Sequence, residues 1–354
     1  MKIRFLTILT VMGLMLSLAG CGQNMQNVDA AKESLQIIAM DTVISASAYG
    51  ENSSDALQAV EQEIYRLEKI FSRTNDASEV SSLNRQPGKQ VKVGQEVCGL
   101  IEAAAEYTAA TDGAFDVSVA PVVSAWGFTE AEHRVPEQAE LENLLEHVGM
   151  EHVHVGRTTV QLDEGTQIDL GGIAKGYASD VAAEIYREYE VSRGTVALGG
   201  NVFVRGTRED GAPWRVGIQD PANLNDTTAL VGMLHLSDAF AVTSGSYQRY
   251  FEKNGKVYHH IIDPATGYPA DSGLTSVTVI APWREDSYTG TMCDALSTAL
   301  FVMGEERALD FWQSSAYEME LVLVTEDGRV LVTEGAADWF TAAEDTGYVY
   351  ETVS

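Results

Sequence analysis

The segment Gln167-Ile168-Asp169-Leu170-Gly171-Gly172-Ile173-Ala174-Lys175-Gly176-Tyr177 contains the strongest local structural signal in the chain. Its first four residues predict a short strand, two glycines predict a tight turn, and a helix is expected from Ile173 to about Tyr189. Such a turn places backbone N–H groups where a phosphate could bind. The segment matches neither the Walker spacing nor the dinucleotide-binding Gly-x-Gly-x-x-Gly pattern, so a turn that simply needs glycine explains it equally well.

Strands and helices alternate irregularly on both sides of this segment. Strand patterns are predicted at 35–49, 152–155, 159–162, 195–198, 201–205, 214–218, 229–236, 258–262, 274–281, 319–325 and 329–333. Helical patterns are predicted from about residue 53 to 71 and at 95–111, 137–148, 292–303 and 305–313, with a Ser/Asn-rich loop at 72–84. This order favours an α+β fold over a doubly wound sheet. We therefore expect one large domain over residues 35–354, with a mixed β-sheet and flanking helices.

The composition is that of an acidic globular protein. Hydrophobic residues make up 45% of the 354 residues, and 23 Lys plus Arg face 52 Asp plus Glu, for a net charge of −29. A surface of this sign repels phosphate backbones, which excludes nucleic acid as a favoured partner. An anionic ligand must therefore be met locally, by a metal ion, a helix N-terminus or a few placed cations.

The N-terminus has the pattern of an export signal. Lys2 and Arg4 precede an apolar run of 15 residues, Phe5–Ala19, which is short for a membrane span. The run ends in Leu18-Ala19-Gly20-Cys21, which resembles a bacterial lipobox. We expect a signal peptide at 1–20, a lipidated Cys21, a tether at 21–34, and attachment to the extracytoplasmic face of the cell membrane (periplasmic if an outer membrane is present). An ordinary cleaved signal with an incidental cysteine is the alternative.

The two remaining cysteines do not define a disulfide. Cys98 lies in a helical pattern, where a buried free thiol is the commoner outcome, and spacing alone does not decide whether Cys98 and Cys293 pair. No bridge is assigned.

A carboxylate and two hydroxyls gather near the C-terminal helices. On a helix, Asp294 and Thr298 are four residues apart and share a face, with Ser297 beside them. A carboxylate plus a hydroxyl is a suitable partial shell for Mg²⁺, which keeps other positions for water and substrate phosphate. The alternative is an Asp near a helix N-terminus and a Thr that bonds back to the helix backbone.

Two further clusters contain residue types used in catalysis and ring binding. His260 and Asp263 stand at the rim of a strand that ends in Pro264-Ala265-Thr266-Gly267, and His260 is suited to moving a proton near neutral pH. Phe115, in Gly113-Ala114-Phe115-Asp116, could stack on a planar ring or pack in the core. The segment 243–247 (Thr-Ser-Gly-Ser-Tyr) is predicted to be a polar loop.

Together these clusters resemble the FAD:protein FMN transferase family (ApbE-type lipoproteins). Each motif is modest alone, but their shared order over most of the exported body makes the resemblance specific. The motifs are Met40-Asp41-Thr42, Ser78-Glu79 with Leu83-Asn84, Gly113–Asp116, Asp169–Tyr177, Leu198-Gly199-Gly200-Asn201, Thr243–Tyr247, His260–Gly267 and Asp294-Ala295-Leu296-Ser297-Thr298.

The resemblance implies a transferase that binds FAD with Mg²⁺, moves FMN onto a Thr or Ser hydroxyl of another protein and releases AMP. By position it implies flavin-nucleotide contacts at Met40, Ala114, Phe115, Asp116, Gly171, Tyr177 and Ile262. It implies metal contacts at Ala174 (through its carbonyl), Asp294 and Thr298, with Ser297 adjacent. Thr74 occupies a flavin-contact position where many relatives carry a tyrosine, so we expect one ring contact to be missing there.

We expect His260 to accept the proton of the attacking hydroxyl or to orient the group that does. The implied acceptors are flavin-carrying subunits of membrane redox complexes. Two alternatives remain open: an FAD pyrophosphatase that yields AMP and free FMN, and a non-catalytic FAD-binding lipoprotein.

Overall fold

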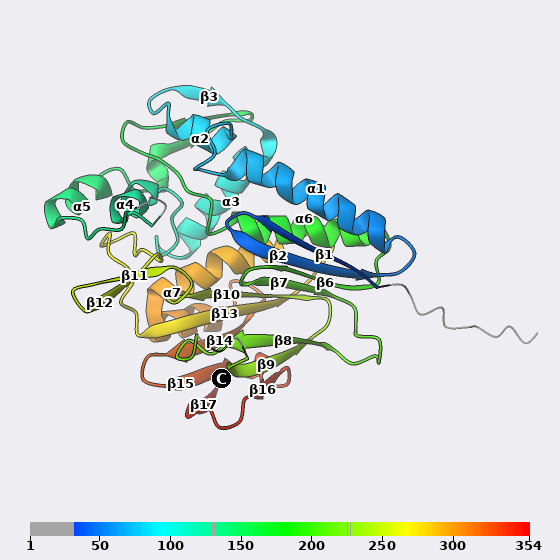
Figure 1. Ribbon diagram of the computed structural model, residues 1–354. Helices are drawn as coiled ribbons and strands as arrows, with labels where there is room; N and C mark the ends of the chain where they lie inside the picture. The colour runs from blue at the N-terminus through cyan, green and yellow to red at the C-terminus, as the bar shows by residue number, and fades with distance from the viewer. Residues whose placement is uncertain (1–31, 129–131, 225, 227) are drawn as a thin grey trace, which may run out of the picture. The chain divides into compact units, whose positions relative to one another are not determined.

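A nine-stranded mixed sheet runs through the centre of the computed structural model, which describes residues 32–128, 132–224, 226 and 228–354 (Figure 1). Adjacent strands in this sheet run antiparallel, except for the last two, which are parallel to each other. In spatial order the strands are β1 (Lys32–Ala39), β2 (Thr42–Tyr49), β6 (Arg193–Leu198), β7 (Asn201–Arg205), β10 (Ala239–Gly245), β13 (Leu274–Pro282), β14 (Glu320–Thr325), β15 (Arg329–Thr333) and β17 (Val349–Val353).

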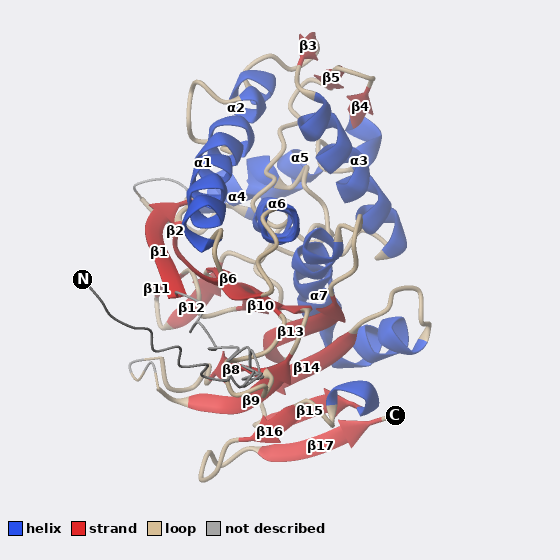
Figure 2. Ribbon diagram, turned by 90° about the vertical axis from the view of Figure 1, so that its right-hand side faces the viewer, coloured by secondary structure: helices blue, strands red, loops and turns tan. Residues whose placement is uncertain are grey.

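Helices cover one face of this sheet and a second sheet covers the other (Figure 2). The main core forms where the central sheet meets α1 (Ser53–Phe71), α3 (Gln95–Ala110), α6 (Ala174–Glu188) and α7 (Thr289–Gln313). On the opposite face, β8 (Trp214–Gln219), β9 (Leu230–Leu236) and β16 (Phe340–Ala342) pack on the sheet through a smaller apolar cluster. Both faces of the central strands are therefore buried, as their apolar composition requires.

Two smaller units complete the described chain. One contains α2 (Glu79–Asn84) and a three-stranded sheet of β3 (Gln90–Lys92), β5 (Thr159–Leu162) and β4 (Val153–Val155), preceded by a 3₁₀ turn at Met150–His152. In the other, Trp126 is buried against a hairpin. Its elements are α4 (Ala120–Trp126), α5 (Gln138–Leu145), β11 (Tyr250–Lys253) and β12 (Lys256–His259). Outside these two units, a second 3₁₀ turn spans Glu334–Ala336.

The α+β prediction is confirmed, with differences in detail. The strand expected at 167–170 is wrong: only Gln167 makes a bridge, and both backbone groups of Ile168 bond to the side chain of Asn84 at 2.8 Å. A side chain there replaces the neighbouring strand. Likewise, the first residues of the predicted polar loop 243–247 are the end of β10, and α2 lies within the predicted loop 72–84.

Element boundaries shift where long-range contacts extend a local pattern. β1 begins at Lys32, so the last three residues of the expected tether pair with β2. α7 begins at Thr289 and is interrupted at Gly304, whose φ of 77° separates the two helices predicted there. The signal peptide and Cys21 lie outside the described residues.

The described cysteines are both free and buried. The buried free thiol expected at Cys98 is confirmed, and Cys293 is completely enclosed in the main core. Among residues 32–354 as described, no helix is both long enough and apolar enough to cross a membrane.

Candidate active site

A cavity of about 760 Å³ opens at the end of the central sheet where α6 and α7 begin. Its lining draws on segments that are far apart in the sequence. The structure brings together in its wall most of the residues expected in the site: Met40, Thr74, Ala114, Phe115, Asp116, Gly171, Ala174, His260, Ile262, Asp294 and Thr298.

Two expected site residues do not line this cavity. The Tyr177 hydroxyl donates to Glu96 at 3.0 Å, and its ring stacks on Tyr288, on the far side of α6. Ser297 is fully buried beneath Thr298 and bonds to the Ser244 hydroxyl at 2.8 Å. Ser297 therefore supports the wall of the cavity from behind.

Asp294 is held in the wall by a very close crossing of α6 and α7. A Cβ added to Gly176 would lie 2.3 Å from the carbonyl oxygen of Gly290 and 2.7 Å from the Cβ of Asp294. Only glycine permits this approach, and it lets the Gly176 N–H donate to Asp294 Oδ2 at 2.8 Å. The glycine in the motif at 176 is thus explained by helix packing rather than by turn formation.

Asp180 fixes the start of α7. Its carboxylate accepts the N–H groups of Gly290 and Thr291 at 2.7 and 2.8 Å and the Thr291 hydroxyl at 2.6 Å. These are the otherwise unpaired donors of a helix N-terminus, where a negative charge is favoured. Burial nevertheless raises the pKa of Asp180 to about 7, against the opposing effect of these hydrogen bonds.

The oxygen atoms at Asp294 and Thr298 suit a hard cation. Asp294 is 4% exposed, its Oδ1 lies 4.0 Å from Lys175 Nζ, and Thr298 Oγ1 lies 3.2 Å from Ser244 Oγ. Within the described residues, no three His, Cys, Asp or Glu side chains are grouped as a metal site. One carboxylate and one hydroxyl fit Mg²⁺, which completes its shell with water and substrate phosphates.

Protein carboxylates accept two N–H groups of the glycine segment, one before α6 and one in its first turn. Asp169 Oδ1 accepts the Gly171 N–H at 2.8 Å, while Asp294 takes that of Gly176. Of the two interpretations of this glycine segment, the structure therefore favours the tight turn over a simple phosphate cradle. Asp169 also pairs with Arg73 at 3.1 Å, in a largely buried contact.

Phe115 and Asp116 also line the cavity, near Gly172 and Thr298. A Cβ on Gly172 would lie 3.2 Å from the Phe115 ring and 3.9 Å from Thr298 Oγ1. The motifs at 113–116, 169–177 and 294–298 therefore converge at this point. Asp116 Oδ1 accepts both the N–H and the hydroxyl of Ser118, at 2.7 and 2.6 Å. Burial raises the pKa of Asp116, and the two bonds from Ser118 oppose that rise.

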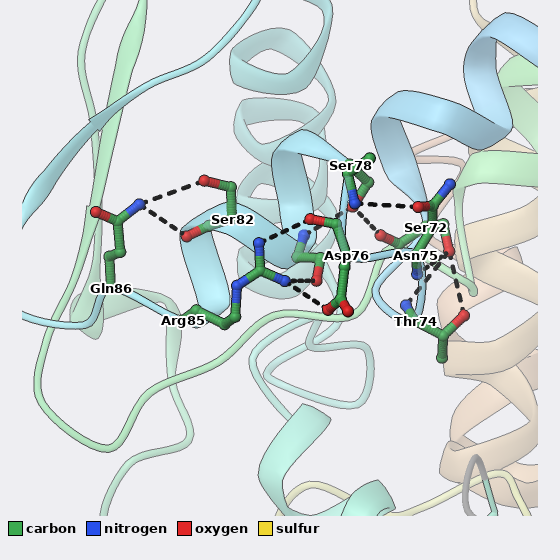
Figure 3. Close-up of polar contacts among 10 residues, drawn as sticks. Ser72, Thr74, Asn75, Asp76, Ser78, Ser82, Arg85 and Gln86 are labelled. Atoms are coloured by element: carbon green, nitrogen blue, oxygen red, sulfur yellow. Dashed lines mark hydrogen bonds and ion pairs between the residues drawn. The ribbon is translucent and has the colours of Figure 1, made fainter.

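Met40 and Thr74 lie on turns at the cavity edge. Met40 has a positive φ of 51°, which is unusual for a residue with a side chain, and its N–H donates to Glu68 at 2.6 Å. Figure 3 shows Thr74 in a turn organised by the Ser72 hydroxyl, which lies 3.2 Å from the Thr74 hydroxyl and accepts the Asn75 N–H at 3.1 Å. Thr74 thus lies at the cavity with a short, polar side chain.

His260 presents a neutral imidazole to the cavity. Its Nδ1 lies 3.3 Å from the carbonyl oxygen of Arg249, which can only accept, so Nδ1 carries the proton and Nε2 has a free lone pair. Dehydration, with the nearby charges of Arg249 and Lys175, lowers the pKa of His260 to about 4. The ring can therefore accept a proton throughout the neutral pH range.

Three cations line the cavity: Arg73, Lys175 and Arg249. Sequence reasoning considered Lys175 as a group that could steady a phosphate, but it missed Arg73 and Arg249. The three cations supply local positive charge in an acidic protein. The motif at 169–177 contains Lys175, but nothing in the sequence pairs Arg73 with a residue 96 positions away. Asn201, in the motif at 198–201, also lines the cavity.

Comparison with known proteins places these features in a family. The model of the ApbE family matches residues 40–323. The FAD:protein FMN transferase of Treponema pallidum (strain Nichols) is 32% identical over 322 residues, 85% of this chain and 86% of that protein. The FAD:protein FMN transferase of Klebsiella pneumoniae (strain 342) is 32% identical over 319 residues, 89% of this chain and 96% of that protein.

The fold is shared as well. The crystal structure of the ApbE protein from Thermotoga maritima aligns with a TM-score of 0.79 at 35% identity, over 87% of this chain and 99% of that one. The ApbE-like fold expected from the motifs is confirmed. By its motifs, its fold and the match over most of its length, this chain belongs to the ApbE family.

Proposed function

We propose that this protein is an FAD:protein FMN transferase, which moves FMN from FAD onto a Thr or Ser hydroxyl of an acceptor protein and releases AMP. Membership of the ApbE family supports the activity. The observation that carries the chemistry is the convergence of Asp294, Thr298 and His260 on one cavity that also contains three cations. Phosphoryl transfer depends mainly on positioning and on stabilising negative charge, and this cavity supplies groups for both.

Asp294 and Thr298 would hold Mg²⁺, with the carbonyl of Ala174 as a further oxygen ligand. The bound ion would neutralise charge on the pyrophosphate and on the departing AMP. In this assignment Lys175, 4.0 Å from Asp294 Oδ1, is the protein's own cation beside the same phosphates. Arg73 is already paired with Asp169 and therefore orients the turn at Gly171.

His260 Nε2 would take the proton of the attacking hydroxyl. Its neutral state and its protonated Nδ1 both follow from the surroundings described above. A pKa of about 4 makes a weak base, but an anionic pyrophosphate beside the ring would raise it toward neutrality. His260 is thus matched to a site whose substrate is negatively charged.

Cys21 would attach the enzyme to the extracytoplasmic face of the membrane. The flavin-carrying subunits of membrane redox complexes are the acceptors that this location favours. A shared surface raises the effective concentration of the enzyme and acceptor relative to free diffusion. A Cys21→Ser chain that stays in the membrane fraction after export would contradict the lipid anchor.

Product analysis tests the activity directly. The purified protein is incubated with FAD, Mg²⁺ and a candidate acceptor, and AMP, free FMN and acceptor-bound FMN are quantified. Equal amounts of AMP and covalent FMN-acceptor are expected. AMP with an equal amount of free FMN would make the enzyme a pyrophosphatase, and intact bound FAD would leave only a carrier.

Asp294→Asn provides the metal control for this assay. The amide removes a charge from the proposed ligand, so transfer should need a much higher Mg²⁺ concentration. Asp163→Asn changes the same charge on a carboxylate that does not line the cavity, and its Mg²⁺ dependence should match that of the unmodified protein. Equal Mg²⁺ dependence in both variants would remove Asp294 from the metal site.

A further inference from the structure

Asn201 has a buried side-chain amide without a hydrogen-bond partner. It is the first residue of β7 and is 2% exposed. Among the described residues, no group bonds its Nδ2 atom. Buried amides in folded proteins are nearly always paired, so an exception that lines a cavity indicates a missing ligand.

The strand geometry places this amide beside the proposed metal-binding residues. Asn201 pairs with Val242 on β10, so its side chain faces the helix layer, as do those of Val242 and, two residues further along β10, Ser244. Ser244 in turn contacts Ser297 and Thr298 of α7. Asn201 therefore belongs to the part of the cavity that contains Asp294 and Thr298.

The backbone around Asn201 leaves it little freedom to find another partner. A Cβ on Gly199 would lie 2.8 Å from the Thr42 hydroxyl, and one on Gly200 would lie 2.6 Å from the carbonyl of Thr243. The turn before β7 is thus packed tightly against β2 and β10. The backbone position from which the Asn201 side chain extends is therefore fixed before any ligand enters.

Asn84 shows what a structural asparagine looks like in the same chain. Both ends of its amide are used, with Nδ2 and Oδ1 each 2.8 Å from the backbone of Ile168. Asn84 holds the segment 167–170 in place of a strand. In the part of the chain that the structure describes, Asn201 Nδ2 has no such partner, which distinguishes it from the scaffold amide of Asn84.

We propose that the Asn201 amide donates a hydrogen bond to a pyrophosphate oxygen of bound FAD. This inference rests on the proposed function, because Asp294 and Thr298 mark the position of the pyrophosphate only if they hold its metal ion. A neutral donor suits the position, since it binds a phosphate oxygen without competing with a cation for Asp294. A hydrogen bond to a charged oxygen is among the stronger ones.

The test combines stability with ligand binding in Asn201→Leu and Asn84→Leu. The urea midpoint of Asn201→Leu should be unchanged or higher, because no hydrogen bond is lost in the free protein. Its affinities for Mg²⁺-FAD and Mg²⁺-ADP should both fall about 10- to 100-fold, while that for riboflavin, which lacks phosphate, should not change. Asn84→Leu should show the opposite stability result, with a lower midpoint.

Three outcomes would overturn the assignment. Asn201→Leu could bind Mg²⁺-FAD within twofold of the unmodified protein, could lose riboflavin binding to the same extent, or could unfold as readily as Asn84→Leu. An unmodified protein that binds no FAD would overturn this inference together with the proposed function. One that binds FAD but transfers no FMN would overturn the proposed function alone, and the binding comparison would still decide the role of Asn201.

Discussion

Replacement of Gly176 with alanine tests whether the crossing of α6 and α7 positions Asp294, the proposed metal ligand. Gly176 lies within α6, where alanine is the better helix former by about 1 kcal/mol. Helix propensity alone thus predicts a more stable protein. The packing predicts the reverse, because the new methyl group would lie 2.3 Å from the Gly290 carbonyl oxygen and 2.7 Å from the Asp294 Cβ.

The magnitude follows from these distances. Ordinary contact begins at 3.4 Å, so α6 and α7 must separate by roughly 1 Å, and the nearest atom belongs to the backbone and cannot rotate away. Overpacking of this kind costs about 1–3 kcal/mol, and loss of the N–H bond to the Asp294 carboxylate adds about 1.5–3 kcal/mol. After the gain in helix propensity, we expect the free energy of unfolding to fall by about 1.5–5 kcal/mol.

Urea unfolding and Mg²⁺-dependent FAD binding measure the two consequences. Gly99→Ala is the matched control, because Gly99 lies within α3 and its added Cβ would meet nothing within 4 Å. That variant should be neutral or stabilised by up to about 1 kcal/mol, with unchanged binding. Gly176→Ala should unfold at lower urea and require more Mg²⁺ to bind FAD, because Asp294 moves with α7.

The reasoning is refuted if Gly176→Ala is as stable as Gly99→Ala. If Gly176→Ala loses stability but keeps its Mg²⁺ dependence, the crossing is a packing feature that does not position Asp294. Both readouts are needed, since a destabilised protein can still bind ligand normally once it is folded.

Three further predictions concern charge and ring contact. Asp180→Asn should lower the free energy of unfolding by about 2–4 kcal/mol, since an amide nitrogen would face N–H donors. Because burial raises the Asp180 pKa to about 7, the stability advantage of the unmodified protein over this variant should shrink as pH rises from 4 to 7. A constant difference in urea midpoints over this range would contradict the raised pKa. His260, with its pKa lowered to about 4 by dehydration and by Arg249 and Lys175, should leave kcat/KM flat from pH 6 to 8, and an inflection near pH 6.5 that His260→Ala abolishes would show an ordinary imidazole instead. Thr74→Tyr should tighten FAD binding about 2- to 10-fold by adding a stacking ring at the cavity, measured by fluorescence titration, and equal or weaker binding would mean that no ring lies there.

Local patterns in the sequence were sufficient for most elements of the fold. The apolar spacing of α1, α3 and α6 and the alternation in β1 and β2 depend on residues only a few positions apart. Where the prediction was wrong, a distant group had replaced the local signal. The segment 167–170 reads as a strand, yet the Asn84 amide takes the backbone bonds that a neighbouring strand would have made.

The candidate site divides in the same way. Most residues expected from the motifs line one cavity, and each could be proposed because its motif is recognisable from neighbouring residues alone. Tyr177 does not join them, since its place on α6 directs it toward Glu96 and Tyr288, and no local pattern reveals which face of that helix meets the cavity. Arg73 escaped notice because a lone arginine has no signature until its partner Asp169 is known.

The sequence by itself determined the order of elements, the excess of negative charge, and the family through its ordered motifs. Only the tertiary structure decided that the glycine at 176 is required by a helix 114 residues away, that Asp180 starts that helix, and that the Asn201 amide has no partner. The physical reason is the separation along the sequence of the groups that interact. Helix and strand periodicity arise between near neighbours, whereas close approach, burial of charge and unpaired hydrogen-bonding groups exist only once distant segments have packed together.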